Sequence, residues 1–219
     1  MRREARALAA LLWGLVATLA IGCHRDAPAP GPVTMDAAEL ERWEIALVEM
    51  RIEKNERFSD PAQSPLPDTL LAGFEGLNYY FPVPELRFRL PFATAAAGDT
   101  VMLDKNSGER AAYVIRGTVT FRHQGRDHEL TVFGPADPEA DDVLWVPFLD
   151  PTGNDLTHPG GRYLDLERHA DGTVELDFNY AYNPLCSYDE GRFDCALPPP
   201  ANRLPFRVEA GEQRVGPEL

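Results

Sequence analysis

Hydrophobic residues recur at helical spacing in one long stretch of the chain, residues 36–60. The apolar residues that follow one another there at three- and four-residue steps are Leu40, Trp43, Leu47 and Met50. This spacing predicts an amphipathic helix. Asp36 and Glu39 have the spacing of a capping box at its start, and Pro61 marks its end. We expect the apolar face to pack on the rest of the protein, and docking on a partner protein is the alternative.

From Leu86 onward the hydrophobic period drops to two, which is the period of a β-strand. Turns that contain glycine, asparagine or aspartate separate the alternating segments, as in antiparallel sheets. The alternating segments are residues 86–90, 100–103, 113–122, 128–133, 143–148, 162–166 and 174–180. We therefore expect a mainly β fold, an antiparallel sandwich or a barrel-like sheet over residues 61–219, with the amphipathic helix as a minor α+β component.

The last predicted hairpin determines which polar residues share a face. A three-residue loop of residues 170–172, with Gly172 in a left-handed conformation, places the apolar residues of both strands on one side. The facing pairs are then Leu166 and Leu176, Asp165 and Asp177, Leu164 and Phe178, Tyr163 and Asn179, and Arg162 and Tyr180. Opposed carboxylates repel, so Asp165 and Asp177 either point into water, share an arginine or form a polar site. Arg162 falls on the apolar side, where it needs an acceptor.

A basic start and a short apolar segment open the chain. Residues 7–21 are apolar and follow three arginines, as in a secretory signal, but they are shorter than the ~20 residues that span a bilayer. The sequence LAIGC that ends at Cys23 resembles a bacterial lipobox, which makes 1–22 the signal peptide and 23–35 a lipidated cysteine with a proline- and alanine-rich tether. An uncleaved anchor or a plain signal peptide is the alternative. We expect a periplasm-facing envelope protein anchored to a membrane by lipid, and His24 favours the outer membrane over the inner one.

Charge and cysteine content narrow the partners and the compartment. The formal net charge is −14, and an acidic surface repels phosphate backbones, which argues against nucleic acid as a partner. Lipidation of Cys23 leaves Cys186 and Cys195, and an even number of cysteines in an oxidising compartment favours a disulfide. A metal site or free thiols are the alternatives, although the spacing does not fit a zinc motif.

Several unusual words of sequence follow one another in a fixed order. They are SPL at 64–66, FEGLNY at 74–79, GGRYL at 160–164, LDFN at 176–179, AYNP at 181–184, Cys186, Cys195, LPPP at 197–200, NRL at 202–204 and AGE at 210–212. This string resembles a bacterial and archaeal family catalogued as domain of unknown function 1684, here in a lipoprotein member. Because that family has no established chemistry, the resemblance implies domain boundaries and a site position, and it implies no reaction.

The sequence favours a binding or structural module over an enzyme. It contains no nucleophile elbow, zinc-protease helix, phosphate loop or dinucleotide fingerprint, so we expect no catalytic set, metal or cofactor. The candidate binding residues are Arg162, Tyr163, Asp165, Asp177, Asn179, Tyr182, Asn183, Asn202 and Arg203. Arginine with amide and phenol groups suits a small carboxylate or sugar-like ligand, unless the run forms an internal network that locks the proline-rich tail to the sheet. Two alternatives are a hydrolase that uses Asp165 and Asp177 as acid and base, and an accessory subunit that docks through the N-terminal helix.

Overall fold

The computed structural model describes residues 27–96, 98–135 and 143–214. The predicted signal peptide and the predicted lipidation site Cys23 lie outside these residues. Within the described ranges, no helix has both the length and the hydropathy that a membrane span requires.

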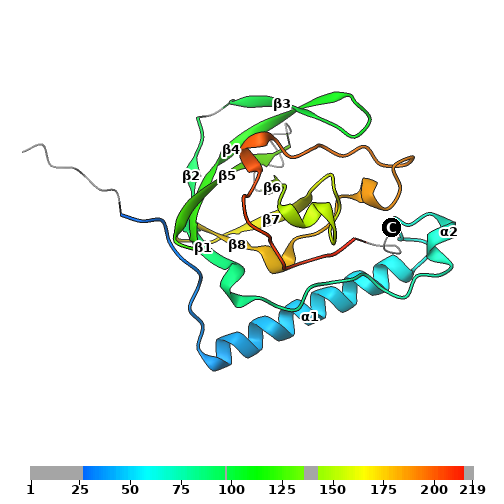
Figure 1. Ribbon diagram of the computed structural model, residues 1–219, viewed down its shortest axis with the longest axis horizontal. Helices are drawn as coiled ribbons and strands as arrows, with labels where there is room; N and C mark the ends of the chain where they lie inside the picture. Colours follow the sequence, from blue (N-terminus) through cyan, green and yellow to red (C-terminus); the bar gives the residue numbers. More distant parts are fainter. Residues whose placement is uncertain (1–26, 97, 136–142, 215–219) are drawn as a thin grey trace, which may run out of the picture.

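Helix α1, Ala37–Ser59, lies along one side of a β-barrel (Figure 1). Its predicted capping box is present, because Glu39 N donates to Asp36 Oδ1 at 2.8 Å and Asp36 N donates to Glu39 Oε2 at 2.9 Å. Trp43 and Leu47 are buried, which confirms the predicted packing face. The short helix α2, Asp68–Leu71, follows.

The strands form a mostly antiparallel sheet that closes almost completely on itself, as one of the two predicted architectures requires (Figure 1). They are β1 Arg87–Pro91, β2 Ala93–Thr94, β3 Thr100–Asp104, β4 Arg110–His123, β5 Arg126–Gly134, β6 Leu144–Phe148, β7 Arg162–Arg168 and β8 Thr173–Asp177. Their order is β1-β8-β7-β6-β5-β4-β2, and β3 also pairs with β4. Only Phe92 separates β1, which pairs with β8, from β2, which pairs with β4. These two consecutive strands therefore join the ends of the sheet into a barrel.

Phenylalanine rings fill the interior of the barrel. Rings of Phe88, Phe121, Phe148 and Phe178 contact one another with centroids 4.8–6.3 Å apart. The C-terminal segment at residues 204–210 crosses the barrel (Figure 1) and alternates between the core and the surface. Its buried residues are Leu204, Phe206, Val208 and Ala210. This segment belongs to the core although it forms no long strand.

The last hairpin keeps the predicted register, but it is shorter than predicted. Glu167 lies opposite Glu175, and Gly172 has a φ of +81° as expected. The second strand ends at Asp177, because its carboxylate accepts a hydrogen bond from Asn179 N at 2.9 Å and begins a 3₁₀ turn, Phe178–Tyr180. The ladder between β7 and β8 contains only the pairs Glu167–Glu175 and Arg168–Val174. The predicted pairs of residues 162–166 with residues 176–180 are therefore absent from it, and Tyr163 pairs with Tyr182 instead.

Candidate functional site

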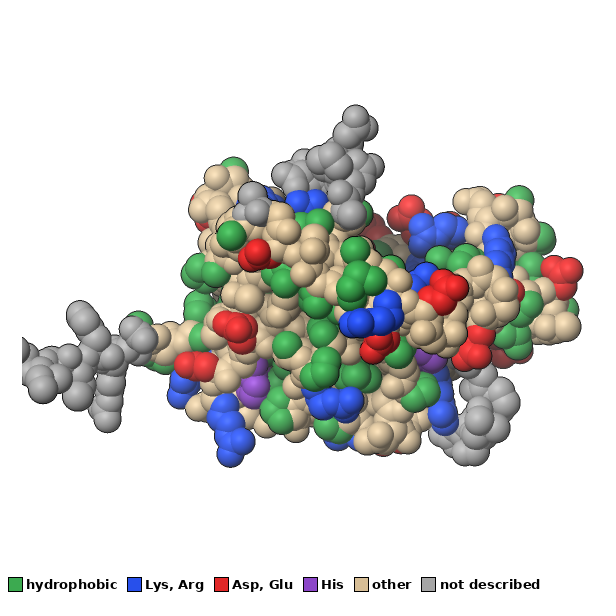
Figure 2. Space-filling model, turned by 90° about the horizontal axis from the view of Figure 1, so that it is seen from above, with side chains coloured by type: hydrophobic (Ala, Val, Ile, Leu, Met, Phe, Trp, Pro, Cys, Tyr) green, Lys and Arg blue, Asp and Glu red, His purple; other side chains and the backbone are tan. Residues whose placement is uncertain are grey.

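A cleft of about 490 Å³ separates the C-terminal half of α1 from strands β7 and β8. The residues that line it are Met50, Lys54, Arg57, Tyr79, Asp165, Glu167, Glu175, Asp177, Tyr180, Ala181, Tyr182 and Glu212. Five of these carry carboxylates and two carry cations, so the lining is acidic. The face of the molecule turned away from α1 differs, because acidic, basic and hydrophobic side chains are interspersed there (Figure 2).

Glu212 is the central buried carboxylate of this cleft, with 1% of its surface exposed. It forms an ion pair with Lys54 of α1. Its Oε2 accepts hydrogen bonds from Asn183 N at 2.8 Å and from the Tyr188 hydroxyl at 2.9 Å. Burial and the negative charge of Glu212 raise the pKa of Tyr188. This network fixes α1 to the C-terminal tail, and it neutralises both Lys54 and Glu212.

Asp177 holds the N-terminal half of α1 to the barrel. It is 4% exposed, and it accepts hydrogen bonds from Trp43 Nε1 at 2.7 Å and from the Asn179 backbone N and Nδ2 at 2.9 and 2.8 Å. Burial raises the pKa of Asp177, and these hydrogen bonds oppose the rise. Asn179 also pairs with the backbone of Val83, from which its Oδ1 accepts at 2.7 Å and to which its Nδ2 donates at 2.9 Å. Both predicted site residues therefore have structural contacts.

Arg162 does not line this cleft, and the prediction that it binds a ligand finds no support in its position. Its side chain points into the barrel, 1% exposed, and donates to Val208 O at 2.7 Å and to Ala210 O. It also forms an ion pair with Asp150 at 3.2 Å. Arg162 therefore fastens the C-terminal segment inside the barrel, which is the internal network that the sequence left as the alternative.

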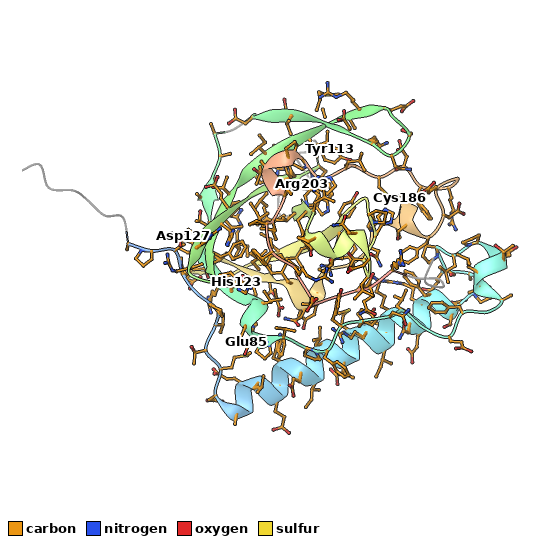
Figure 3. All side chains as sticks on the ribbon, viewed as in Figure 1. Glu85, Tyr113, His123, Asp127, Cys186 and Arg203 are labelled. Atoms are coloured by element: carbon orange, nitrogen blue, oxygen red, sulfur yellow. A yellow bond between two sulfur atoms is a disulfide. The ribbon has the colours of Figure 1, made fainter. Side chains whose placement is uncertain are left out.

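The other end of the predicted site also lies away from the cleft. Asn202 is fully buried; its Nδ2 donates to Thr131 O and Pro147 O, both at 2.8 Å, and its Oδ1 accepts from Thr131 N at 2.8 Å. It joins the 3₁₀ turn Pro200–Asn202 to β5 and β6. Arg203 is exposed near this turn (Figure 3).

Asp165 and Tyr182 are the predicted residues that face the cleft with the fewest internal contacts. Asp165 Oδ1 accepts a hydrogen bond from the Tyr182 hydroxyl at 3.0 Å. Desolvation raises the pKa of Asp165, whereas this hydrogen bond and the positive charge of Lys54 lower it. Among the described residues, neither Asp165 nor Glu167 belongs to an ion pair, although Glu175 is bound by Arg87 at 2.9 Å.

Tyr163 and Asn183 lie on either side of Tyr182 and contribute mainly to its position. Tyr163 donates to Ala196 O at 2.6 Å, and its ring lies 5.9 Å from that of Tyr182. Asn183 is 2% exposed and its Nδ2 donates to Gln213 O at 2.8 Å.

The predicted disulfide is present between Cys186 and Cys195, whose Cα atoms lie 5.9 Å apart. Cys186 lies on the side of the barrel that is nearer to α2 (Figure 3). The bridge closes a loop next to the Tyr163–Ala196 contact.

The charged residues of the cleft that the sequence did not point to are Lys54, Arg57, Glu167, Glu175 and Glu212. Glu212 stands in the AGE word of the string above, which was the available signal for it. Across the residues that the structure describes, no group of three or more His, Cys, Asp or Glu side chains is placed to hold a metal ion.

Comparisons with known proteins identify the family. A family model described as protein of unknown function DUF1684 matches residues 72–213. The chain belongs to this family. It is also similar to a solved structure, the solution NMR structure of the uncharacterised protein from gene locus rrnAC0354 of Haloarcula marismortui. The sequences are 35% identical, the match covers 81% of this chain and 97% of that one, and the TM-score is 0.63. No curated protein matches significantly in sequence.

Proposed function

We propose that this DUF1684 protein is a lipid-anchored module of the bacterial cell envelope that binds a small, positively charged ligand without transforming it. The ligand site is the cleft between α1 and strands β7 and β8. The basic and apolar leader before Cys23 supports the location in the envelope. A cationic ligand replaces the carboxylate or sugar-like ligand expected from the sequence, because Arg162 is enclosed in the barrel.

The observation that carries this proposal is the unequal pairing of the carboxylates in the cleft. Glu212 is paired with Lys54, Glu175 is paired with Arg87, and Asp177 accepts three hydrogen bonds. Asp165 and Glu167 have no such cation among the described residues. Desolvation raises the pKa of Asp165, and a carboxylate in such surroundings attracts a cation more strongly than one in open water. These two side chains are therefore the groups available to a ligand.

The test uses putrescine, a short diamine, as the probe and isothermal titration calorimetry of the full-length chain as the assay. We expect saturable binding that is about tenfold weaker in Asp165→Asn, because a charge-assisted contact is lost. Glu167→Gln should weaken binding in the same direction. Glu109→Gln removes an exposed carboxylate outside the cleft and serves as the matched control. Equal affinities of Asp165→Asn and Glu109→Gln would contradict the proposal.

A hydrolase that uses Asp165 and Asp177 as acid and base is the weaker alternative. Both residues line the cleft. However, Asp177 is 4% exposed, accepts three hydrogen bonds and lies 3.8 Å from Arg87 Nε, which leaves it little access to a substrate proton. The contacts of Asp177 support a structural role.

An accessory subunit that docks through α1 is a second candidate function, supported by a different face from the one predicted. Trp43 and Leu47 pack on the barrel, whereas Ile45, Val48 and Ile52 are 48–52% exposed and lie at three- and four-residue steps. Such a stripe resembles the apolar face of a helix that packs in a groove. Val48→Asp should release a partner if one binds there, and it should leave putrescine binding unchanged.

A further inference from the structure

A second cleft, of about 510 Å³, lies on the outer surface of the barrel and adjoins the acidic cleft. Five aromatic residues line it. Three lie on strands, namely Tyr113 on β4, Trp145 on β6 and Tyr163 on β7, and the other two are Tyr182 and Phe193, of which Phe193 belongs to the disulfide loop. Tyr113 lies at the end of the barrel away from α1 (Figure 3). Asp165 and Tyr182 line both clefts, so the two clefts meet at their hydrogen bond.

The rings that line this aromatic cleft contact one another, two of the pairs edge to face and the third tilted. The Trp145 and Tyr163 rings are 4.7 Å apart between centroids and 88° apart in plane. The Tyr163 and Tyr182 rings are 5.9 Å apart and 86° apart in plane, and Tyr113 lies 5.4 Å from Trp145. An aromatic ring has a negative face, so ring faces that border the cleft attract a positively charged group.

The charges around the rings favour the same kind of ligand. Among the described residues that line the aromatic cleft there is no lysine or arginine, and the two carboxylates are Asp165 and Asp194. Asp194 is neutralised by its ion pair with Lys105. Asp165 forms no ion pair among the residues that the structure describes, and it lies where the aromatic cleft meets the acidic one. An anion would be repelled here, and a purely apolar ligand would desolvate Asp165 further without compensation.

We propose that the aromatic cleft binds an alkylated ammonium group, whose methyl or methylene groups contact the rings of Trp145, Tyr163 and Tyr182 and whose charge is balanced by Asp165. This inference rests on the proposed function, in that Asp165 serves both clefts, and it adds the chemical class of the ligand. An alkylated ammonium satisfies both halves of the cleft, because it offers apolar surface to the rings and positive charge to the carboxylate.

The test compares two probes of the same shape and different charge. Choline carries a trimethylammonium group, and 3,3-dimethylbutan-1-ol carries an uncharged tert-butyl group in its place. We expect choline to bind the full-length chain in calorimetric titrations and the neutral alcohol to bind at least about tenfold more weakly, because the ring faces and Asp165 act on the charge. Equal affinities would show a merely hydrophobic groove and would overturn the inference. Absence of choline binding would overturn it as well.

Variants then locate the bound choline. Trp145→Leu should weaken choline binding by about tenfold, and Trp145→Phe, which keeps a ring, should lose less. Phe81→Ala removes an aromatic side chain that is 91% exposed and lies outside the cleft, and it should bind choline as the natural chain does. The melting temperature of each variant is first compared with that of the natural chain, so that a loss of choline binding is not confused with a loss of folding. If Trp145→Leu alone has a lowered melting temperature, its choline affinity is set aside. Weaker choline binding in Trp145→Phe and Tyr113→Leu then supports the aromatic site, and unchanged choline binding in both overturns it.

Putrescine separates the failure of this inference from the failure of the proposed function. Its two charged ends are primary ammonium groups that carry no methyl groups, so the acidic cleft alone should bind it. Putrescine binding that depends on Asp165, together with choline binding that does not depend on Trp145, would overturn the aromatic site and leave the acidic site in place. Loss of both ligands in Asp165→Asn, with loss of choline alone in Trp145→Leu, is the result that we expect.

Discussion

Replacement of Asp177 by asparagine tests whether this carboxylate is a structural clamp or a catalytic group. Asparagine has nearly the same shape, but it replaces one oxygen by an NH₂ group. Because the two oxygens of Asp177 accept from Trp43 and from Asn179, a donor in the variant must face another donor. The clamp between α1 and the barrel should therefore weaken.

The magnitude follows from the contacts of Asp177. A hydrogen bond to a charged group contributes roughly 1.5–3 kcal/mol, and the loss of one such bond leaves a buried donor unsatisfied. The burial that raises the pKa of Asp177 also means that the buried charge itself is costly, and this cost disappears in the variant. We expect a net loss of about 2 kcal/mol in the free energy of unfolding at neutral pH.

Urea denaturation of Asp177→Asn, followed by tryptophan fluorescence and circular dichroism, measures this loss. Trp43→Phe removes the same hydrogen bond from the other partner, and the double variant should lose less than the sum of the two single variants. Because burial raises the pKa of Asp177, the folded chain binds this proton more tightly than the unfolded chain does. The stability difference between the natural chain and Asp177→Asn should therefore grow as pH falls through the pKa of Asp177. A variant within about 0.5 kcal/mol of the natural chain would refute the clamp.

Three further predictions follow from the same contacts. Arg162→Met should cost roughly 3–5 kcal/mol in urea denaturation, since it leaves Asp150 and several carbonyl groups buried without their donor; a loss below about 1 kcal/mol would contradict the role of Arg162 in the barrel. Replacement of Cys186 and Cys195 by serine should cost roughly 2.5–3 kcal/mol, because their bridge closes a short loop, and an unchanged melting temperature would contradict it. Putrescine affinity should fall as pH is lowered, with a midpoint above about 3.9, because desolvation raises the pKa of Asp165 and only its ionised form attracts the diamine; an affinity that is constant down to that pH would exclude Asp165.

Local signals explain which parts of the fold could be predicted from the sequence. The helix 37–59 was predicted because its cap, its apolar spacing and its end all lie within one segment. The hairpin register was predicted because Gly172 fixes the turn. The end of β8 was missed because the side chain of Asp177 hydrogen-bonds Asn179 locally and thereby competes with the sheet. The alternation of apolar and polar residues does not indicate such a side-chain hydrogen bond.

Contacts between distant segments explain what could not be predicted. Alternation correctly placed Arg162 on the inner side, but its carbonyl acceptors lie 46 to 50 residues later, at Val208, Ala210 and Glu212. The pairing of Lys54 with Glu212 joins residues 158 positions apart. Of the nine proposed site residues, Asp165, Asp177 and Tyr182 line the acidic cleft. Only the folded chain distinguishes the buried residues from Asp165, which faces the cleft.

A titration of the isotope-labelled full-length chain with putrescine, followed by amide chemical shifts, tests the central claim most directly. That claim is that the carboxylates of the cleft which lack a cation, Asp165 and Glu167, are the ligand-binding groups of this DUF1684 protein. We expect saturable shifts that are largest at Asp165, Glu167 and Tyr182. Absence of shifts, or shifts that are largest at the exposed stripe from Ile45 to Ile52, would contradict it.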